Sequence, residues 1–184
     1  MSRVLAECPL VCHPDTPCDA LAALGARITL REDHGWDVAF IAVGDPGKMS
    51  LPAPTGPVQT DGLWHTTCFE MFIALAGDAY VELNLSPSCA WAAYRFDHYR
   101  TGMRPLTIPA PQISIAMGHE RAALTTALSE DALPWDRSGQ IGLSAVIESR
   151  DGTVSYWALA HPPGKPDFHH RDCFALTLPP VSGE

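Results

Sequence analysis

Residues 61–100 read DGLWHTTCFEMFIALAGDAYVELNLSPSCAWAAYRFDHYR and contain two short runs with an apolar residue at every second position. In the first run the apolar side chains stand at positions 69, 71, 73 and 75, and in the second at positions 81, 83 and 85. Side chains point alternately to the two faces of a strand. Each run therefore predicts a β-strand with one apolar face, and the pair predicts a β-hairpin.

The register of this hairpin follows from its apolar faces. A two-residue turn at residues 77–78 would set the apolar face of one strand opposite the polar face of the other, whereas a three-residue loop at residues 77–79 brings like faces together. The longer loop pairs Phe72 with Asn84 and collects four polar side chains on one face, Glu70, Glu82, Asn84 and Ser86. Because Phe72 and Tyr80 lie beside them, this face favours a ligand surface over one that meets only solvent.

The rest of the chain continues the pattern of short strands and turns. In the stretch 90–98, Trp91 and Arg95 share one face, and Tyr94 and Phe96 share the other. Residues 20–24 are compatible with a short helical turn. Further strands are predicted at residues 26–31, 36–43, 112–117, 121–128, 140–148, 154–160 and 173–178. With seventeen prolines and fourteen glycines between these segments, the pattern predicts an all-β sandwich or barrel that spans residues 1–184 as one domain.

Charge and composition exclude several classes of protein. Twelve basic and twenty-one acidic residues give a formal net charge of −9, which argues against nucleic-acid binding because that function needs a basic face. No apolar run approaches the ~20 residues that span a bilayer, and the N-terminus lacks the apolar core of a signal peptide. The six cysteines have no zinc-type spacing and indicate reduced thiols. We therefore expect a cytoplasmic protein that binds neither nucleic acid nor membrane.

Two segments carry a family resemblance. The first contains DGLWHTTCFE, the strand pair FEMFIAL and YVELNLSP, and the continuation CAWAAYRFDHYRTGM; the second is SYWALAHPPGKPDFHHRDCFALTL near the C-terminus. Together they resemble the DOMON-like superfamily, in its bacterial branch related to carbohydrate-binding module family 9. Members of this superfamily are antiparallel β-sandwiches whose concave sheet face or rim binds a sugar or a haem. The resemblance thus implies a single antiparallel β-sandwich for this chain.

The resemblance also implies a set of ligand-binding residues. The sugar-binding members use stacked aromatic rings, which here would be Trp91 and either Trp64 or Trp157. The matching polar side chains would be Glu70, Glu82, Asn84 and Arg95. An indole ring can cover the apolar face of a pyranose, while charged and amide groups bond its hydroxyls. The haem-binding members use a Met and a His as axial ligands. No Met/His pair here matches theirs, and we expect no cofactor.

A histidine-rich loop offers a second group of candidate residues. Residues 161–172 read HPPGKPDFHHRD and contain His161, His169 and His170. His169 and His170 are adjacent, so in an extended chain their side chains point in opposite directions. His161 with one of them and a nearby aspartate could form a three-ligand metal site. The spacing is not that of a zinc motif, and we expect no metal, with the histidines instead fixing the loop by hydrogen bonds.

These observations give one main prediction and two rivals. We expect a non-catalytic protein that binds a small polar ligand, most simply a carbohydrate, on the face of Glu70 and Glu82, with the histidine loop at its rim. The first rival is a hydrolase or lyase-type enzyme that uses His161, His169 or His170 with one of these glutamates, with or without a metal, because a carboxylate pair can hydrolyse glycosidic bonds. The second is a haem-binding or protein-interaction module. The sequence has no nucleophile elbow, P-loop or dinucleotide-binding pattern.

Overall fold

The computed structural model describes residues 2–132 and 139–178. In these ranges the chain forms twelve β-strands and four three-residue 3-10 turns, and no longer helix. The strands are β1 (Arg3–Cys12), β2 (Leu21–Leu30), β3 (Trp36–Gly44), β4 (Cys68–Ala74), β5 (Tyr80–Leu85), β6 (Trp91–Phe96), β7 (Arg104–Pro105), β8 (Gln112–Met117), β9 (Arg121–Leu128), β10 (Gln140–Glu148), β11 (Val154–Ala158) and β12 (Leu176–Thr177). The turns are η1 (Pro46–Lys48), η2 (Leu63–His65), η3 (Glu130–Ala132) and η4 (Arg171–Cys173). The predicted all-β class is confirmed.

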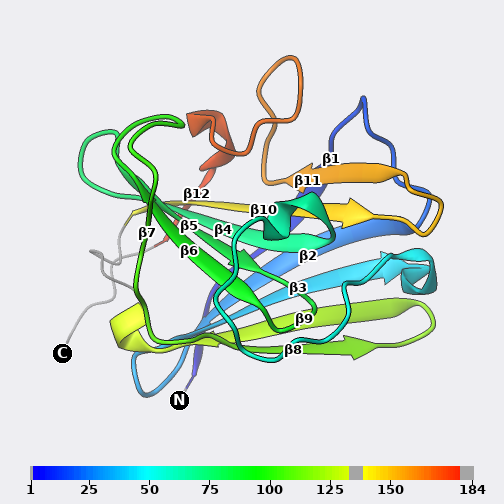
Figure 1. Cartoon of the computed structure of the whole chain (residues 1–184), viewed down its shortest axis with the longest axis horizontal. Coiled ribbons are helices and arrows are strands. Elements are labelled where there is room, and N and C mark those ends of the chain that lie inside the picture. The colour runs from blue at the N-terminus through cyan, green and yellow to red at the C-terminus, as the bar shows by residue number, and fades with distance from the viewer. Residues whose placement is uncertain (1, 133–138, 179–184) are drawn as a thin grey trace.

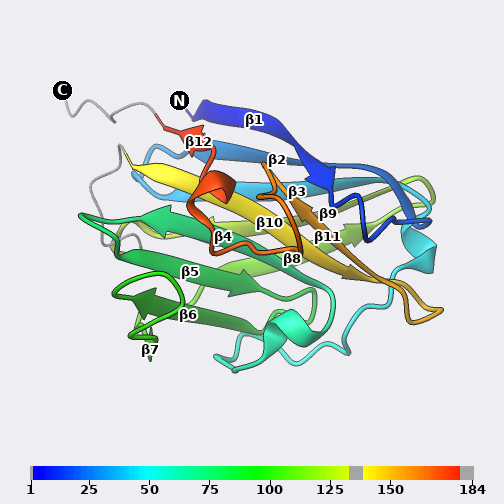
Figure 2. The ribbon, with the colours of Figure 1, turned by 90° about the horizontal axis from the view of Figure 1, so that it is seen from above.

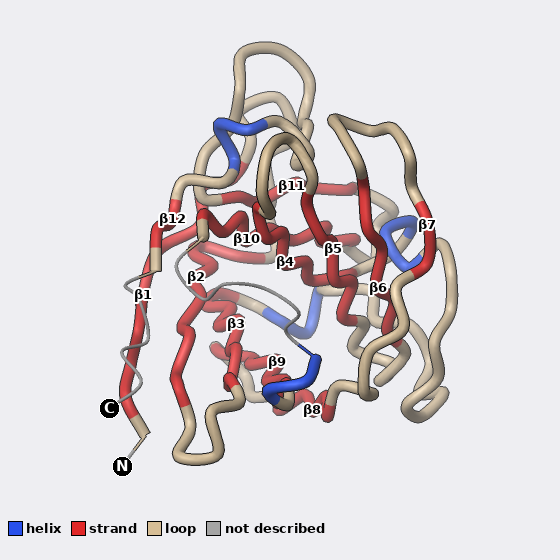
Figure 3. Tube along the Cα trace, turned by 90° about the vertical axis from the view of Figure 1, so that its left-hand side faces the viewer, coloured by secondary structure: helices blue, strands red, loops and turns tan. Residues whose placement is uncertain are grey.

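The strands form one antiparallel hydrogen-bonded path that folds over on itself. Its order is β7-β6-β5-β4-β10-β11-β1-β2-β3-β9-β8, and β12 pairs with β10 beside this path. β1 joins the two layers, because its first part pairs with β2 and its last two residues, Val11 and Cys12, pair with β11. Figure 1 and the end-on view in Figure 3 show the two layers, which we call sheet A (β1, β2, β3, β9, β8) and sheet B (β7, β6, β5, β4, β10, β11). The predicted antiparallel β-sandwich is therefore confirmed.

The central hairpin has the predicted faces but a different register. β4 and β5 pair Glu70 with Asn84 and Phe72 with Glu82, two residues away from the predicted pairing. The connecting loop still has three residues, 76–78, because the Leu75 N–H donates to the Ala79 carbonyl. Gly77 lies at its centre with φ of 69°, a left-handed conformation that glycine adopts without strain. A shift of two residues leaves every side chain on its predicted face, since the side-chain period of a strand is two.

The N-terminal part of the chain departs further from prediction. Residues 21–24 belong to β2 and not to a helical turn, and β1 is a strand that the alternation pattern does not reveal. A bulge between Leu21 and Ala23 changes the alternation at the start of β2, after which Leu24 and Ile28 are buried. The local sequence LAALGARITL permits either structure. In the folded chain this segment pairs with β1 on one side and β3 on the other, and this pairing stabilises the strand over the helical turn.

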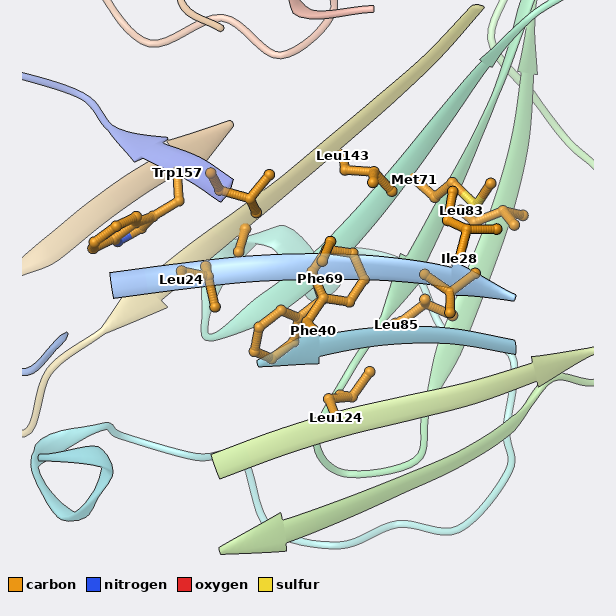
Figure 4. Close-up of a cluster of buried hydrophobic side chains, with 14 of the residues drawn as sticks. Leu24, Ile28, Phe40, Phe69, Met71, Leu83, Leu85, Leu124, Leu143 and Trp157 are labelled. Atoms are coloured by element: carbon orange, nitrogen blue, oxygen red, sulfur yellow. The ribbon is translucent and has the colours of Figure 1, made fainter. Parts of the chain in front are cut away.

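The main core lies between the two sheets. Leu24, Ile28, Phe40 and Leu124 from sheet A face Phe69, Met71, Leu83, Leu85 and Leu143 from sheet B (Figure 4). The rings of Phe40 and Phe69 meet across the interface with their centroids 5.1 Å apart. Each such side chain contributes about 1.5–3 kcal/mol when it is fully buried. This core accounts for the apolar face of every strand in the central hairpin.

Sheet B is also covered on its outer face. A second hydrophobic cluster lies there, beneath the C-terminal segment, which is the chain after β11 (residues 159–178). It contains Phe168 and Phe174 of that segment together with Phe72, Tyr80, Tyr94 and Phe96 of the sheet. Figure 2 shows that segment, in orange and red, lying over β10 and β4. All six residues of β5 are buried as a result. The polar side chains of the hairpin thus lie inside the protein, at the bottom of a third layer, and not on an open sheet face.

Candidate ligand-binding pocket

A pocket of about 470 Å³ opens on the outer face of sheet B. Strands β4, β5, β6, β10 and β11 form its floor, while the η2 segment, the loop after β6 and the C-terminal segment form its walls. Its lining combines a polar floor with aromatic and aliphatic walls: Trp64, His65, Glu70, Glu82, Tyr94, Phe96, Arg100, Met103, Val146, Val154, Tyr156, Pro166, Phe168 and His169. This volume and composition are typical of a site for a small organic ligand.

Glu82 occupies the centre of the floor on β5. Its side chain is 5% exposed, and its Oε1 accepts a hydrogen bond of 2.7 Å from the Asn84 side-chain amide. Burial raises the pKa of Glu82 to about 7, although the bond from Asn84 and the charge of Arg100 act in the opposite direction. At neutral pH this carboxyl group therefore exchanges readily between its charged and neutral forms.

Glu70 lies next to Glu82, on β4. It is 3% exposed and accepts a hydrogen bond of 3.2 Å from the Ser144 hydroxyl of β10. Burial, and then the charge of Glu82, raises the pKa of Glu70 well above its usual range. Two adjacent buried carboxyl groups do not both ionise at low cost. The two adjacent acids therefore favour a state in which at most one of them is ionised.

The C-terminal segment places the His169 ring over this pair. Its Nδ1 lies 2.7 Å from the Tyr80 hydroxyl, and its Nε2 lies 3.8 Å from Glu82 Oε2. Burial, together with the charge of Arg100, lowers the pKa of His169 to about 4, so the ring is neutral at pH 7. The Tyr80 hydroxyl accepts a bond from the Arg100 backbone N–H. If that hydroxyl donates to Nδ1, the proton of the neutral ring is on Nε2, directed at Glu82.

Arg100 belongs to the loop between β6 and β7. Its φ is 53°, in the left-handed region that non-glycine residues rarely adopt. Its backbone bond to Tyr80 and its side chain hold it there, since the guanidinium forms a 2.8 Å ion pair with Asp167 of the C-terminal segment. The Tyr99 hydroxyl also donates to Asp167. These bonds tie the loop after β6 to the histidine loop, and together they close one side of the pocket.

Aromatic rings form the other side of the pocket. Trp64 lies at the rim, 36% exposed, with its ring centroid 6.0 Å from that of Tyr94 in an edge-on contact. The Tyr94 hydroxyl donates a 2.7 Å hydrogen bond to Asp61. This bond holds the residues just before η2 against β6. Tyr156 and Phe168 pack together, 5.9 Å apart, on the β11 side. Aromatic rings thus lie on two sides of the pocket, where a planar apolar face of a ligand can pack against them.

Four of the predicted site residues meet in this pocket, namely Trp64, Glu70, Glu82 and His169. Asn84 is fully buried beneath it and acts through its bond to Glu82. The polar residues that the sequence groups on one face of the hairpin therefore lie at or beneath the floor of one pocket. His169 and His170 diverge as expected, although they lie in a turn in which the His170 N–H donates to the Asp167 carbonyl and not in an extended segment. His170 is half-exposed, and its Nδ1 accepts from the Asp172 N–H outside the pocket.

The other predicted site residues lie elsewhere. Trp91 and Arg95 pair with Leu85 and Val81, so both side chains are on the opposite face of sheet B from Glu82. Trp91 belongs to the main core, and the expectation that it walls the ligand face is therefore corrected. The reason is register: on β6 the residue opposite Glu82 is Tyr94, so the face of Tyr94 and Phe96 turns toward the carboxylates.

His161 is also outside the pocket. Its Nε2 lies 2.8 Å from the Val11 carbonyl, and its ring contacts that of His13 at 4.8 Å. It stabilises the start of the histidine loop against the end of β1, as the simpler interpretation of that loop predicts. Trp157, the other aromatic candidate, is buried in the main core.

The pocket contains residues that the sequence alone did not single out as a site. Tyr94 and Phe96 could have been found from their alternation with Arg95, once the register with β5 was known. Tyr156, Phe168 and Ser144 come from distant segments, and no local pattern marks them. Their role depends on which elements lie side by side.

No group of three His, Cys, Asp or Glu side chains within residues 2–132 and 139–178 is placed to hold a metal ion. None of the helical turns in the described part of the chain is long and apolar enough to cross a membrane.

Comparison with known proteins adds a fold relationship. Neither a scan against protein-family models nor a search of curated proteins found a match. Among solved structures, the chain is similar to a protein from Bacteroides uniformis ATCC 8492 described as a "putative carbohydrate-binding protein", with a TM-score of 0.60 and 13% sequence identity over 92% of this chain and 84% of that one. At this identity the likeness concerns the fold. The chain therefore shares its all-β architecture with a protein to which carbohydrate binding has been ascribed.

Proposed function

We propose that this protein is a non-catalytic binding protein for a small carbohydrate or a related polar ligand. The observation that carries the proposal is the pocket on sheet B, in which carboxyl groups line the floor and aromatic rings line the walls. Hydroxyl groups of a sugar can bond to Glu70, Glu82 and His169, while its apolar ring face packs against Trp64. The fold shared with the Bacteroides uniformis protein supports this ligand class.

Titration with soluble sugars tests the proposal. Trp64 is half-buried at the rim, so a bound ring changes its surroundings, and we expect tryptophan fluorescence to change saturably during the titration. Trp64→Ala removes the stacking surface and should weaken binding about tenfold, since stacking and apolar burial of one indole contribute on the order of 1–3 kcal/mol.

Met117→Ala is the matched control, because Met117 is an exposed apolar side chain on β8 of sheet A. It should leave affinity unchanged. Equal loss in both variants, or no saturable binding of any sugar by the wild type, would contradict the proposal.

One observation favours a second candidate, a hydrolase or lyase-type enzyme. Glu82 has a pKa of about 7 and lies 3.8 Å from a neutral imidazole, a combination suited to proton transfer near pH 7. Incubation with aryl glycosides and oligosaccharides decides: product formation that Glu82→Gln abolishes would replace the binding proposal with this one.

The cytoplasmic location inferred from the sequence is part of the same proposal. Fractionation of cells that produce the full-length protein tests it.

A further inference from the structure

The charges in the pocket do not balance. Its lining includes two carboxyl side chains, Glu70 and Glu82, and one guanidinium, that of Arg100. Arg100 is already engaged, because both its Nε and its Nη2 donate to Asp167. In the part of the chain that the structure describes, neither glutamate forms an ion pair with a lysine or arginine. The floor of the pocket therefore holds acidic groups without a protein cation bonded to them.

Burying a carboxylate without a partner cation costs free energy, and proteins usually avoid it except where the group has a function. Glu70 receives one hydrogen bond from Ser144, and Glu82 receives one from Asn84. Both groups respond by retaining their protons up to higher pH than usual. A ligand that brings its own positive charge would remove this penalty, because it would pair with the carboxylates as they ionise.

The walls suit a cation as well. Trp64, Tyr94, Phe96, Tyr156 and Phe168 present aromatic rings toward the same space. The negative faces of such rings attract an ammonium group, with tryptophan the strongest. His169, the basic group over the floor, is neutral at pH 7 and does not compete for the carboxylates. Aromatic walls above a buried acidic floor form a site for an organic cation.

We propose that the ligand of this pocket carries a protonated amine and that, within the carbohydrate class, the site selects amino sugars over neutral sugars. This inference rests on the proposed function and names its ligand class. The amine N–H groups donate to the Glu82 carboxylate and to a carboxyl oxygen of Glu70, and the ring of the sugar packs against Trp64. The proton of Glu82 leaves to solvent as the ammonium pairs with the carboxylate.

Several titratable or charged groups lie around Glu82 and affect the equilibrium between its protonated form and its ammonium-paired form. They are Glu70 and Cys68 on β4, Tyr80 on β5, Tyr94 on β6 with its partner Asp61, Arg100 with Asp167, and His169. Protons compete with the ammonium for Glu82, so the affinity for an amino sugar should rise about tenfold between pH 5.5 and pH 7, while binding of a neutral sugar changes little.

Isothermal titration calorimetry on the full-length protein tests the inference. The probes are glucosamine, galactosamine and mannosamine, each compared with its N-acetyl derivative and with the parent hexose. At pH 7 we expect at least one free amine to bind about tenfold or more tightly than its N-acetyl form, since a charge-assisted bond replaces a neutral one. Titrations in buffers of different ionisation enthalpy should show release of a proton for the amine only.

Glu82→Gln keeps the shape of the floor and removes its charge, so the affinities for the amine and the N-acetyl forms should become equal and the proton release should disappear. Glu120→Gln, at an exposed acid between β8 and β9, is the control and should retain both. Equal affinities for amine and N-acetyl forms would overturn the inference and leave the proposed function standing. If no sugar of either kind binds, the proposed function fails and the inference fails with it.

Discussion

At the scale of single residues, the pocket depends on polar side chains placed where strands usually carry apolar ones. Asn84 is fully buried in a strand, and its amide donates to Glu82. Asparagine is depleted in strands, so its presence here indicates a specific partner. Glu82 in turn carries a pKa of about 7, so its charge changes around neutral pH. The protonation of this one group sets both the stability of the floor and its charge toward a ligand.

Glu82→Gln should change how stability depends on pH. The pKa of Glu82 in the folded chain, about 7, lies above its unfolded value near ~4.3. The folded state therefore holds this proton more tightly, and the stabilisation is fully present below about pH 4.3 and is lost as pH rises through about 7. Glutamine mimics the protonated acid, so at pH 8 the variant should be more stable than the wild type by about 1–3 kcal/mol, and near pH 4 the two should be equal.

Denaturant unfolding of both proteins from pH 4 to pH 8 measures this difference. His169 acts with the opposite sign, because its lowered pKa of about 4 means that stability is lost as pH falls from about 6.5 toward 4. It is present in both proteins, so the difference between them isolates Glu82. Parallel pH profiles for the wild type and the variant would show that Glu82 ionises normally.

At the scale of elements, the pocket depends on how closely the C-terminal segment approaches sheet B. Gly142 of β10 makes this approach possible. A Cβ atom there would lie 2.9 Å from the Phe174 ring, 3.2 Å from the Cys173 carbonyl and 3.2 Å from Phe72 Cβ. Cys173 ends the η4 turn, Phe174 follows it directly and Phe72 lies on β4, while His169 precedes the turn by two residues. The absence of a side chain at Gly142 thus positions the imidazole over the carboxylates.

Gly142→Ala should therefore loosen the C-terminal segment. Overpacking of this kind costs about 1–3 kcal/mol, and because His169 moves with the segment, the affinity for ligand should fall too. Thermal unfolding and sugar titration measure the two effects.

Gly77→Ala is the matched control for this substitution. Gly77 has open space around it but a φ of 69°, so alanine there should reduce stability by about 1 kcal/mol through backbone strain and leave binding unchanged. Unaltered binding in Gly142→Ala would show that the approach of the C-terminal segment does not shape the pocket.

At the scale of the whole molecule, sheet B differs from sheet A because it is buried on both faces. Its inner face packs in the main core, and its outer face packs under the C-terminal segment and the η2 region. Among the residues that the structure describes, no buried cluster covers the outer face of sheet A, and β8 at its edge has mostly exposed residues. The molecule thus combines a three-layered part, which contains the pocket, with a two-layered part.

Hydrogen exchange should reflect this arrangement. We expect the slowest amide exchange in β4, β5 and β10, which have neighbours on both sides and on both faces, and the fastest strand exchange in β8. A saturating sugar should slow exchange in the loop after β6 and in residues 161–170, where Arg100 and His169 lie, and leave sheet A unchanged. Ligand protection centred on β2 or β9 would move the site to the other sheet.

The sequence pattern alone predicts the all-β class, the faces of the hairpin and the grouping of Glu70, Glu82 and Asn84. These features are local, because side-chain alternation has a period of two and survives an error of two residues in register. It also determined that His169 and His170 diverge. It could not decide between strand and helical turn at residues 20–24, because that choice depends on pairing with β1 and β3.

Which side chains lie above the hairpin depends on long-range packing. Alternation on β6 separates Tyr94 from Arg95 but does not say which of them faces Glu82; the pairing of β5 with β6 says so. His169 and Glu82 are far apart in the chain and meet only because the C-terminal segment crosses sheet B. That crossing buries the carboxyl groups and raises their pKa values, and burial depends on the whole chain. Residue types and faces are local properties, whereas the pocket and its charge state arise from long-range packing.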